Sequence, residues 1–409
     1  MSYDVERIRS HFPALREGAA HFDGPGGTQT PDVVASAVAE ALTSAVSNRG
    51  TVTRSEQRAE RIVVEARAAM GDLLAAEPDG VVFGRSATDL TFHFARTLSA
   101  TWSPGDEVVV TRLDHDANIR PWVLAAEAVG ATVRWVDFDA ATGELDPVAV
   151  ADAVSERTRI VAVTAASNLI GTRPDLRNIA RTAHEAGALL WVDGVHGTAH
   201  HLPDLRASGA DFWTCSPYKF VGPHLGAVAA APSLLETLHP AKLLPSSDAV
   251  PERFELGTLP YELLAGTTAA VNFLAGLDAA ATGSRRERLT SSYAALETHE
   301  HALSARLETG IRALPGVTAY SNASRRTPTF LFTVDGRSPR DVQVALAELG
   351  VNAPASHFYA WECSHHLGLG AEGGVRVGLA PYTNDDDVTR LVDGLTAVVG
   401  DSRPTGPGG

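Results

Sequence analysis

The chain contains two lysines, and one of them, Lys219, lies in the stretch 214-TCSPYKFVGPHLG-226. Arginine supplies nearly all of the other positive charge, since lysine and arginine together number 34. Arginine can replace lysine where only charge is needed, but its pKa, above about 12, prevents it from attacking a carbonyl as a neutral amine. Lys219 is therefore a candidate nucleophile of the kind that forms a Schiff base with an aldehyde.

Further polar residues follow short apolar, β-branched runs that are typical of strands. Each one alone fits a purely structural role, because Asp, Asn and Ser favour turns and a single His is usually a packing residue. Ligands of open parallel sheets, however, bind at the carboxyl ends of the strands, so these residues together predict one site. The residues are Asp193 ending 189-LLWVD-193, Asn168 after 159-RIVAVTAA-166, His115 after 107-EVVVT-111, Ser216 after 211-DFWTC-215, and Thr88 at the start of the helix after 81-VVFGRSA-87.

These residue types match the needs of one cofactor, pyridoxal 5′-phosphate (PLP). A lysine binds its aldehyde, and a buried carboxylate such as Asp193 keeps its pyridine nitrogen protonated, so that the ring can take up electrons. Hydroxyl and backbone N–H groups at a helix N-terminus, here Thr88 with Ser216, hold a phosphate. The ring of His115 would stack on the face of the cofactor.

The elements that must position these residues alternate between strands and helices from about 80 to 232. Near-continuous apolar strands alternating with helices predict a mostly parallel sheet covered on both faces. Beyond it, residues 260–313 are largely helical, and strand–helix–strand patterns follow. We therefore expect an N-terminal segment, 1–20, that packs on a small domain, a large domain, 21–284, a smaller α/β domain, 285–400, and a disordered tail, 401–409.

Composition excludes several classes of protein. The chain has 409 residues, 44% of them apolar and 20% charged, as in ordinary globular proteins. A net charge of −15 without a basic run argues against a nucleic-acid partner. The N-terminus lacks the uninterrupted apolar segment of a signal peptide, and no later stretch reaches the length of a membrane span. Two cysteines without zinc-type spacing predict a reduced, cytoplasmic protein with no bound metal.

At this point the sequence resembles the class V aminotransferase and cysteine desulfurase family of fold-type I PLP enzymes, from about residue 20 to 395. This resemblance implies an aspartate aminotransferase-type large domain and a smaller C-terminal α/β domain. Six stretches carry it, in the family's order: 114-DHDANIRPW-122, 167-SNLIGT-172, 193-DGVHGTAH-200, 215-CSPYKFVGPHLG-226, 253-RFELGTLP-260 and 376-RVGLAPYTNDDDVTRLV-392.

The resemblance implies a role for each matching residue. Lys219 forms the internal aldimine and then acts as general acid and base, while Arg376 grips the substrate carboxylate through a two-pronged ion pair. Asn48, Arg49 and the loop 24-GPGGTQ-29 border the substrate. The implied cofactor contacts are Asp193 at the pyridine nitrogen, His115 on the ring face, Asn168 and His196 near the ring hydroxyl, and Ala87, Thr88 and Ser216 at the phosphate, joined by Thr258 of a second subunit in a homodimer.

A cysteine desulfurase also needs a cysteine that accepts sulfur as a persulfide on a mobile loop. Cys215 lies within a predicted strand, and packing explains it best. Cys363 precedes Arg376 by 13 positions, but the pattern 357-HFYAWECSHHLGLG-370 predicts a short helix. The stretch resembles a desulfurase-like subgroup without a sulfur-accepting cysteine, so we expect a structural role for Cys363. The four histidines 200, 201, 365 and 366 are expected to be surface or packing residues.

The remaining machinery labilises bonds at the α and β carbons of an amino acid. We expect a PLP-dependent, desulfurase-like enzyme of a small amino acid, with C–S cleavage by β-elimination or desulfuration as its reaction. A class V aminotransferase is the close alternative, and racemisation or decarboxylative carbon–carbon bond formation uses the same residues. A catalytically silent binding module is disfavoured by the intact Lys219, Asp193 and Arg376. A nucleotide-binding protein is disfavoured because no Gly-x-Gly-x-x-Gly or Walker loop follows the first strands.

Overall fold

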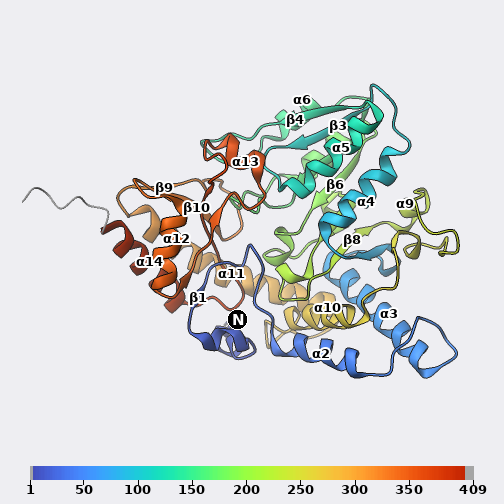
Figure 1. Cartoon of the computed structure of the whole chain (residues 1–409), viewed down its shortest axis with the longest axis horizontal. Helices are drawn as coiled ribbons and strands as arrows, with labels where there is room; N and C mark the ends of the chain where they lie inside the picture. Colours follow the sequence, from blue (N-terminus) through green and yellow to red (C-terminus); the bar gives the residue numbers. More distant parts are fainter. Residues whose placement is uncertain (1–2, 401–409) are drawn as a thin grey trace, which may run out of the picture.

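The computed structural model describes residues 3–400, so the predicted disordered tail 401–409 lies outside the described residues. Its larger sheet has seven strands in the order β2-β8-β7-β6-β5-β3-β4. β8 is antiparallel to both of its neighbours, and the other strand pairs are parallel, which confirms the predicted fold class (Figure 1). The strands are β2 (Val81–Gly84), β3 (Glu107–Thr111), β4 (Thr132–Val136), β5 (Thr158–Thr164), β6 (Leu189–Asp193), β7 (Phe212–Cys215) and β8 (Gly226–Ala230).

Helices cover both faces of this sheet, which is why its central strands are buried at almost every position. On one face, Phe94 of α4 and Trp122 of α5 pack against Trp191 and Phe212 of the strands, with ring centroids 5.2–5.5 Å apart. The helices of this part are α2 (Asp32–Thr43), α3 (Arg54–Leu74), α4 (Ala87–Ser99), α5 (Arg120–Val129), α6 (Pro147–Ala153), α7 (Leu176–Glu185), α8 (Leu205–Ser208), α9 (Pro232–Glu236) and α10 (Tyr261–Leu274).

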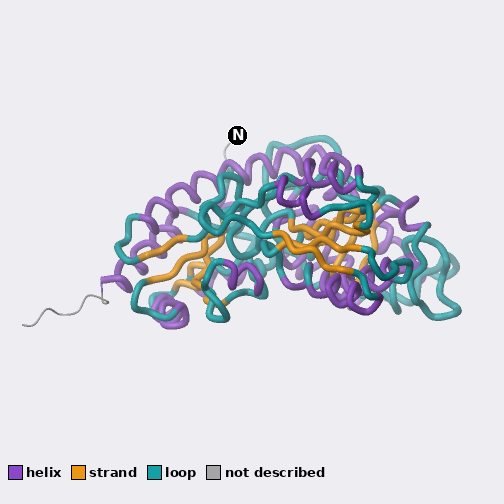
Figure 2. Tube along the Cα trace, turned by 90° about the horizontal axis from the view of Figure 1, so that it is seen from above, coloured by secondary structure: helices purple, strands orange, loops and turns teal. Residues whose placement is uncertain are grey.

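A second, four-stranded sheet in the order β12-β13-β10-β9 has a hydrophobic core of its own, and Figure 2 shows the two sheets as separate groups of strands. A short parallel pair, β1 with β11, lies beside it. The strands and helices of this second part of the chain are β1 (Ala20–His21), β9 (Val317–Ala319), β10 (Thr329–Val334), β11 (Val351–Asn352), β12 (Ala355–Ser356), β13 (Gly374–Gly378), α12 (Pro339–Glu348), α13 (Trp361–His366) and α14 (Asp385–Gly400).

The long helix α11 (Arg285–Arg312) connects the two parts. Its first half contributes Leu289 and Tyr293 to the core of the large sheet, and its second half contributes Leu303 and Leu307 to the core of the small one. A capping box formed by Ser284 and Glu287 begins the helix. Because one helix serves both cores, the predicted domain boundary at 284/285 stays a prediction.

The N-terminal segment, which contains α1 (Val5–Arg9), contacts both parts. The Arg9 guanidinium donates to Tyr382 O at 2.6 Å and pairs with Asp387 at 2.7 Å. The Arg7 guanidinium donates to Leu277 O at 2.7 Å on the other side. The segment therefore stabilises the junction of the two parts. Among residues 3–400, each helix is too short or too polar to span a lipid bilayer.

Candidate active site

One pocket at the carboxyl ends of β5, β6 and β7 brings together most of the predicted site residues. Parallel strands end at the same edge of a sheet, so residues far apart in the sequence meet there. Eight predicted residues line this pocket, which we call the cofactor pocket: Ala87, Thr88, His115, Asn168, Asp193, His196, Ser216 and Lys219.

Lys219 ends a single 3₁₀ turn that follows β7. Its Nζ donates to Pro25 O at 2.6 Å and to Gly26 O at 3.0 Å, so the predicted substrate-bordering loop 24–29 lies against the amine. Burial, and then the nearby charge of Arg376, lower the pKa of Lys219 from 10.5 to about 7. A large fraction of the amine is therefore uncharged at neutral pH, as nucleophilic attack on an aldehyde requires.

Asp193 is the last residue of β6 and is 7% exposed. Its Oδ1 accepts a hydrogen bond from Val195 N–H at 2.8 Å. Burial raises the pKa of Asp193 to about 6, while that hydrogen bond and the Lys219 charge act in the opposite direction. A cationic partner in the pocket, such as a protonated pyridine nitrogen, would stabilise the carboxylate.

The start of α4 forms one end of the pocket. Ser86 caps the helix by accepting from Asp89 N–H, and the first-turn N–H groups of Ala87 and Thr88 are left for an anion. The helix start lies directly on β8, because a Cβ at Gly226 would lie only 2.2 Å from the Ser86 carbonyl carbon. Glycine at 226 therefore permits this close approach.

The polar groups of the pocket fit PLP. Asn168 Oδ1 is buried and has no hydrogen-bond partner among residues 3–400, although the Nδ2 of the same side chain donates to Phe358 O at 3.0 Å. An unsatisfied buried acceptor beside an amine of lowered pKa and a helix N-terminus matches the ring hydroxyl, the aldehyde and the phosphate of the cofactor. Lys219 would hold the aldehyde, Asp193 the pyridine nitrogen, and Ala87, Thr88 and Ser216 the phosphate.

Burial favours the uncharged form of both histidines in the pocket. His115 Nδ1 accepts from Ala117 N–H at 3.0 Å, and burial lowers the pKa of His115 to about 3. His196 Nε2 lies 3.0 Å from the hydroxyls of both Thr327 and Thr329, and burial lowers its pKa well below 6.5. Threonines of the β10 region thus fix the ring of a residue in the large-sheet pocket.

Arg376 of β13 does not line the pocket itself but contacts Asn168, which does, and is 2% exposed. Its Nη1 donates to Asn168 O at 2.8 Å, and its guanidinium carbon lies 3.7 Å from the centre of the Phe358 ring. Its Nε is buried and has no hydrogen-bond partner in the described part of the chain. Burial lowers the pKa of Arg376 to about 9. An anionic substrate group would offset the cost of this buried charge.

The turn at Phe358 and Tyr359 was not predicted as part of the site. Both residues have positive φ, 50° and 59°, in a region that non-glycine residues rarely adopt. Tyr359 O accepts from Asp116 N–H at 2.7 Å, and its ring stacks on His115 at 5.7 Å. Because neither residue is a glycine, no local sequence signal predicts this backbone.

Besides Arg376, three predicted residues do not line the cofactor pocket. Arg49 pairs with Glu60 at 2.8 Å and with Glu252 at 2.9 Å, while Asn48 and Thr258 are exposed. Their roles at the substrate and across a subunit interface stay predictions. Among the remaining histidines, His200 is buried and its Nδ1 lies 3.0 Å from Glu300, so it is a paired core residue and not a surface residue.

Both cysteines are fully buried. Cys363 lies in α13, which confirms the predicted short helix, and Cys215 lies in β7. Burial raises the pKa of each thiol above its usual value. Neither sulfur therefore has the exposure or the thiolate character of a sulfur acceptor.

Comparison with known proteins relates this geometry to a family. Residues 20–391 match the family described as aminotransferase class-V. The uncharacterized protein MT3887 of Mycobacterium tuberculosis is 35% identical, with 97% of this chain and 100% of the relative covered. The aminotransferase-like protein FGM3 of Gibberella zeae is 31% identical (97% and 99% covered), and a probable cysteine desulfurase of Pseudomonas aeruginosa is 30% identical (94% and 95% covered).

Solved structures agree with these relatives. The cysteine desulfurase CsdA of Escherichia coli superposes with a TM-score of 0.85 at 25% identity, with 98% of this chain and 99% of that chain covered. A cysteine desulfurase of Thermococcus onnurineus NA1 has the same fold, with a TM-score of 0.88 at 23% identity and the same coverage. The chain belongs to the aminotransferase class-V family and is a PLP-dependent enzyme with the fold of the cysteine desulfurases.

Proposed function

We propose that this enzyme is cysteine desulfurase-like and cleaves the C–S bond of a small amino acid. The observation that carries the proposal is the meeting of Lys219, Asp193 and Asn168 in one pocket, with the buried Arg376 donating to Asn168 O. The amine is available as a base, and the arginine is available to a carboxylate. Cysteine desulfurases among the relatives and among the similar structures support the choice of sulfur chemistry.

Each residue has one task in this proposal. Bound PLP supplies an electron sink for the electrons released at the substrate α-carbon. Arg376 binds the substrate carboxylate and orients the amino acid, as arginine's planar fork allows. The Lys219 amine takes the proton from the α-carbon, and Asp193 holds its carboxylate against the pyridine nitrogen. Loss of the sulfur substituent at the β-carbon then needs no further nucleophile.

The buried cysteines favour β-elimination over a persulfide route. A persulfide forms on a thiolate that the substrate sulfur can reach, and Cys363 is fully buried in α13 with a raised pKa. We propose further that the enzyme is a cytoplasmic homodimer, in which the exposed Thr258 of one subunit contacts the phosphate in the site of the other.

Product analysis with cysteine and related amino acids tests the reaction. Sulfide with pyruvate and ammonia indicates elimination, sulfide with alanine indicates desulfuration, and a pyridoxamine form with a keto acid indicates transamination. Cys363→Ala should leave turnover per bound cofactor unchanged. No sulfide from any sulfur amino acid, with transamination in its place, would contradict the proposal and favour an aminotransferase, as the name of the FGM3 relative suggests.

A further inference from the structure

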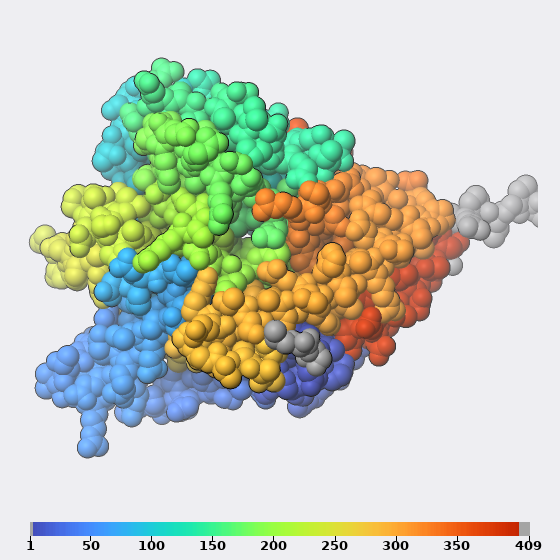
Figure 3. All heavy atoms as spheres, turned by 180° about the vertical axis from the view of Figure 1, so that it is seen from behind, coloured from blue at the N-terminus to red at the C-terminus, as the bar shows by residue number. Residues whose placement is uncertain are grey.

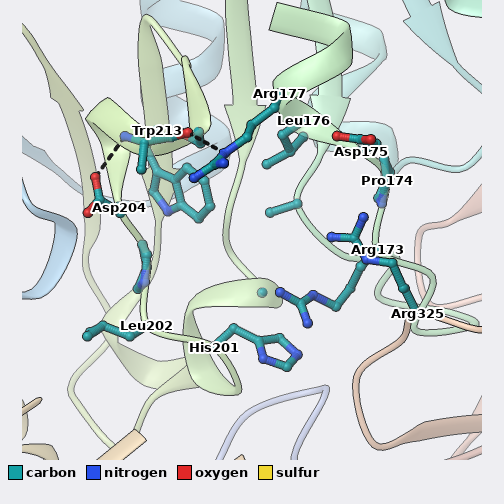
Figure 4. Close-up of a pocket in the computed structure, with 15 residues that line it drawn as sticks. Arg173, Pro174, Asp175, Leu176, Arg177, His201, Leu202, Asp204, Trp213 and Arg325 are labelled. Atoms are coloured by element: carbon teal, nitrogen blue, oxygen red, sulfur yellow. Dashed lines mark hydrogen bonds between the residues drawn. The ribbon is translucent and has the colours of Figure 1, made fainter. Parts of the chain in front are cut away.

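Figure 4 shows a second pocket, which we call the outer pocket. It adjoins the cofactor pocket, since neighbouring residues of the same segments line the two. Its volume is about 430 Å³, within the range of small-molecule sites, roughly 300–1,000 Å³. Figure 3 shows the face of the molecule on which green segments of the large sheet meet orange segments of the C-terminal part. The basic residues of the outer pocket are Arg173, Arg177, His201 and Arg325.

The two pockets share their walls. In the segment at the end of β5, Ala166 and Asn168 line the cofactor pocket, and the neighbouring Ala165 lines the outer pocket. In the turn after β6, His196 lines the cofactor pocket and Gly197 lines the outer one. A ligand in the outer pocket would therefore contact the same backbone segments that position Asn168 and His196.

Two guanidinium groups of the outer pocket have no countercharge in contact. Neither Arg173 nor Arg325 makes a side-chain hydrogen bond or ion pair with any residue from 3 to 400, and Figure 4 shows both side chains extending into the pocket above His201. The Nε2 of His201 is buried and also lacks a hydrogen-bond partner within this described range. Arg177 uses its Nε to donate to Ala207 O at 2.9 Å.

The acidic residues around the outer pocket are already committed to other groups, so they do not neutralise these arginines by direct contact. The carboxylates serve as helix caps or as partners of other basic side chains. They are Asp175 capping α7, Asp204 capping α8, Glu297 paired with His201 at 3.0 Å, Glu300 paired with His200 at 3.0 Å, and Glu308 paired with Arg312 at 2.7 Å and with Arg326.

Placing two like charges in one half-buried pocket is unfavourable unless an anion joins them. Burial lowers the pKa of Arg173, and the charge of Arg325 acts in the same direction, opposed by that of Glu297. An anion with several oxygens would accept from both guanidinium forks at once, the arrangement in which arginine binds most strongly. We propose that the outer pocket binds a small dianionic metabolite that carries a phosphate group or two carboxylates.

The two arginines come from different parts of the chain, so a ligand bound to both would link those parts. Arg173 N–H donates to Arg325 O at 2.8 Å, and Thr172 forms an isolated antiparallel bridge with Arg326. The pocket therefore spans the junction between the segment after β5 and the segment before β10. Thr327, next along the chain, contacts His196. The bound dianion would clamp the large-sheet part to the small-sheet part beside the cofactor, whichever reaction the enzyme performs.

Calorimetric titration of the purified holoenzyme with inorganic phosphate tests the proposal. The holoenzyme is needed because the cofactor phosphate then occupies the start of α4, which would otherwise bind the probe. We expect one saturable site per chain at constant ionic strength, weakened by about tenfold or more in Arg325→Gln and in Arg173→Gln. Arg181→Gln is the matched control, since this exposed arginine pairs with Glu185 on the outside of α7 and should bind phosphate as the wild type does.

A parallel titration with succinate separates the two kinds of anion. Saturable binding of either probe that is lost in the Arg325 variant and kept in the Arg181 variant supports the site and identifies its preferred group. The proposal is overturned if neither anion saturates, if Arg325→Gln binds as the wild type does, or if Arg181→Gln weakens binding equally. Because Arg325 is exposed, its substitution should leave the fold intact, and the visible cofactor band of the variant checks this.

Discussion

Lys219 and Asp193 line one pocket, and burial moves their pKa values toward each other, to about 7 and about 6. Burial disfavours the charged form of both groups, so it lowers the pKa of the lysine and raises that of the aspartate. The lowered pKa of Lys219 favours nucleophilic chemistry at neutral pH. The raised pKa of Asp193 means that its buried carboxylate destabilises the folded protein until a cationic group enters the pocket. The two shifts give separate predictions.

The rate at which the apoenzyme takes up PLP should report the pKa of Lys219. Only the uncharged amine attacks the aldehyde, so the rate should rise with pH up to about 7 and then level off. An ordinary lysine, with a pKa near 10.4, would give a rate that still rises above about pH 9. Growth of the visible absorption band after mixing measures this rate. Lys219→Arg should produce no band, and a rise that continues to about pH 10 would contradict the low pKa.

Asp193→Asn should stabilise the apoenzyme while it abolishes activity. The raised pKa of Asp193 means that the folded wild-type protein binds the proton of this carboxyl group more tightly than the unfolded chain does. The free energy of unfolding of the wild type therefore falls as pH rises from about 4 to about 6. The amide oxygen can still accept from Val195 N–H. We expect a gain on the order of 2 kcal/mol in the free energy of unfolding at about pH 8, vanishing near pH 4.

Urea unfolding of the apoenzyme at the two pH values measures this gain. Asp152→Asn, at an exposed position of α6, is the control for the removal of a surface carboxylate. Equal stability of wild type and Asp193→Asn at both pH values would show that the carboxylate costs nothing in the folded state.

At the scale of elements, the strand-end residues could be predicted and the turn beside them could not. Apolar, β-branched runs such as β3 and β6 show their ends in the sequence, and the parallel arrangement then brings Asp193 and Asn168 to one edge. The backbone at Phe358 and Tyr359 depends on long-range contacts, namely Asn168 Nδ2 with Phe358 O and Asp116 N–H with Tyr359 O. The conformational propensities of the neighbouring residues do not reflect such long-range contacts.

A glycine in the turn at Phe358 and Tyr359 should relieve backbone strain and so stabilise the folded protein. Tyr359 has a φ of 59°, which glycine adopts readily and other residues adopt at a cost of roughly 1 kcal/mol or more. We therefore expect Tyr359→Gly to be more stable than Tyr359→Ala by about 1 kcal/mol, as measured by urea unfolding. The comparison of glycine with alanine removes the tyrosine ring from both variants, so the difference reports the backbone alone.

Ala347→Gly gives the matched comparison in a helix. This exposed position lies in α12, where glycine is expected to be less stable than alanine by about 1 kcal/mol. Opposite signs at 347 and 359 would establish the strain. The same sign at both positions would mean that the turn relaxes without cost, and its contacts to Asn168 and Asp116 would then need no strained backbone.

At the scale of the whole molecule, the site depends on contacts between the two parts of the chain. Arg376 comes from the small sheet and donates to Asn168 O, and Thr327 and Thr329 hold His196 in the pocket of the large sheet. The family resemblance identified Arg376 and His196. No motif in the sequence predicts the two threonines. Besides Arg376, which contacts Asn168, three of the predicted residues, Asn48, Arg49 and Thr258, do not line the pocket of their own chain.

A second subunit would explain the position of Thr258. It is exposed and lies outside its own cofactor pocket, so a phosphate contact requires the site of a neighbouring chain. If the enzyme is a C₂ homodimer, each site combines Lys219 of one chain with Thr258 of the other. Thr258→Asp would then place a negative charge beside the partner's phosphate and weaken PLP binding, while Lys219→Ala removes the amine from its own site.

Mixing the two inactive variants should therefore restore activity. After unfolding and refolding together in equal amounts, about half of the dimers contain one chain of each kind, and each of these has one site with neither lesion. We expect about a quarter of wild-type activity from the mixture and almost none from either variant alone. If Thr258 acted within its own chain, every site would keep one lesion. The mixture would then stay inactive, although gel filtration would still show dimers.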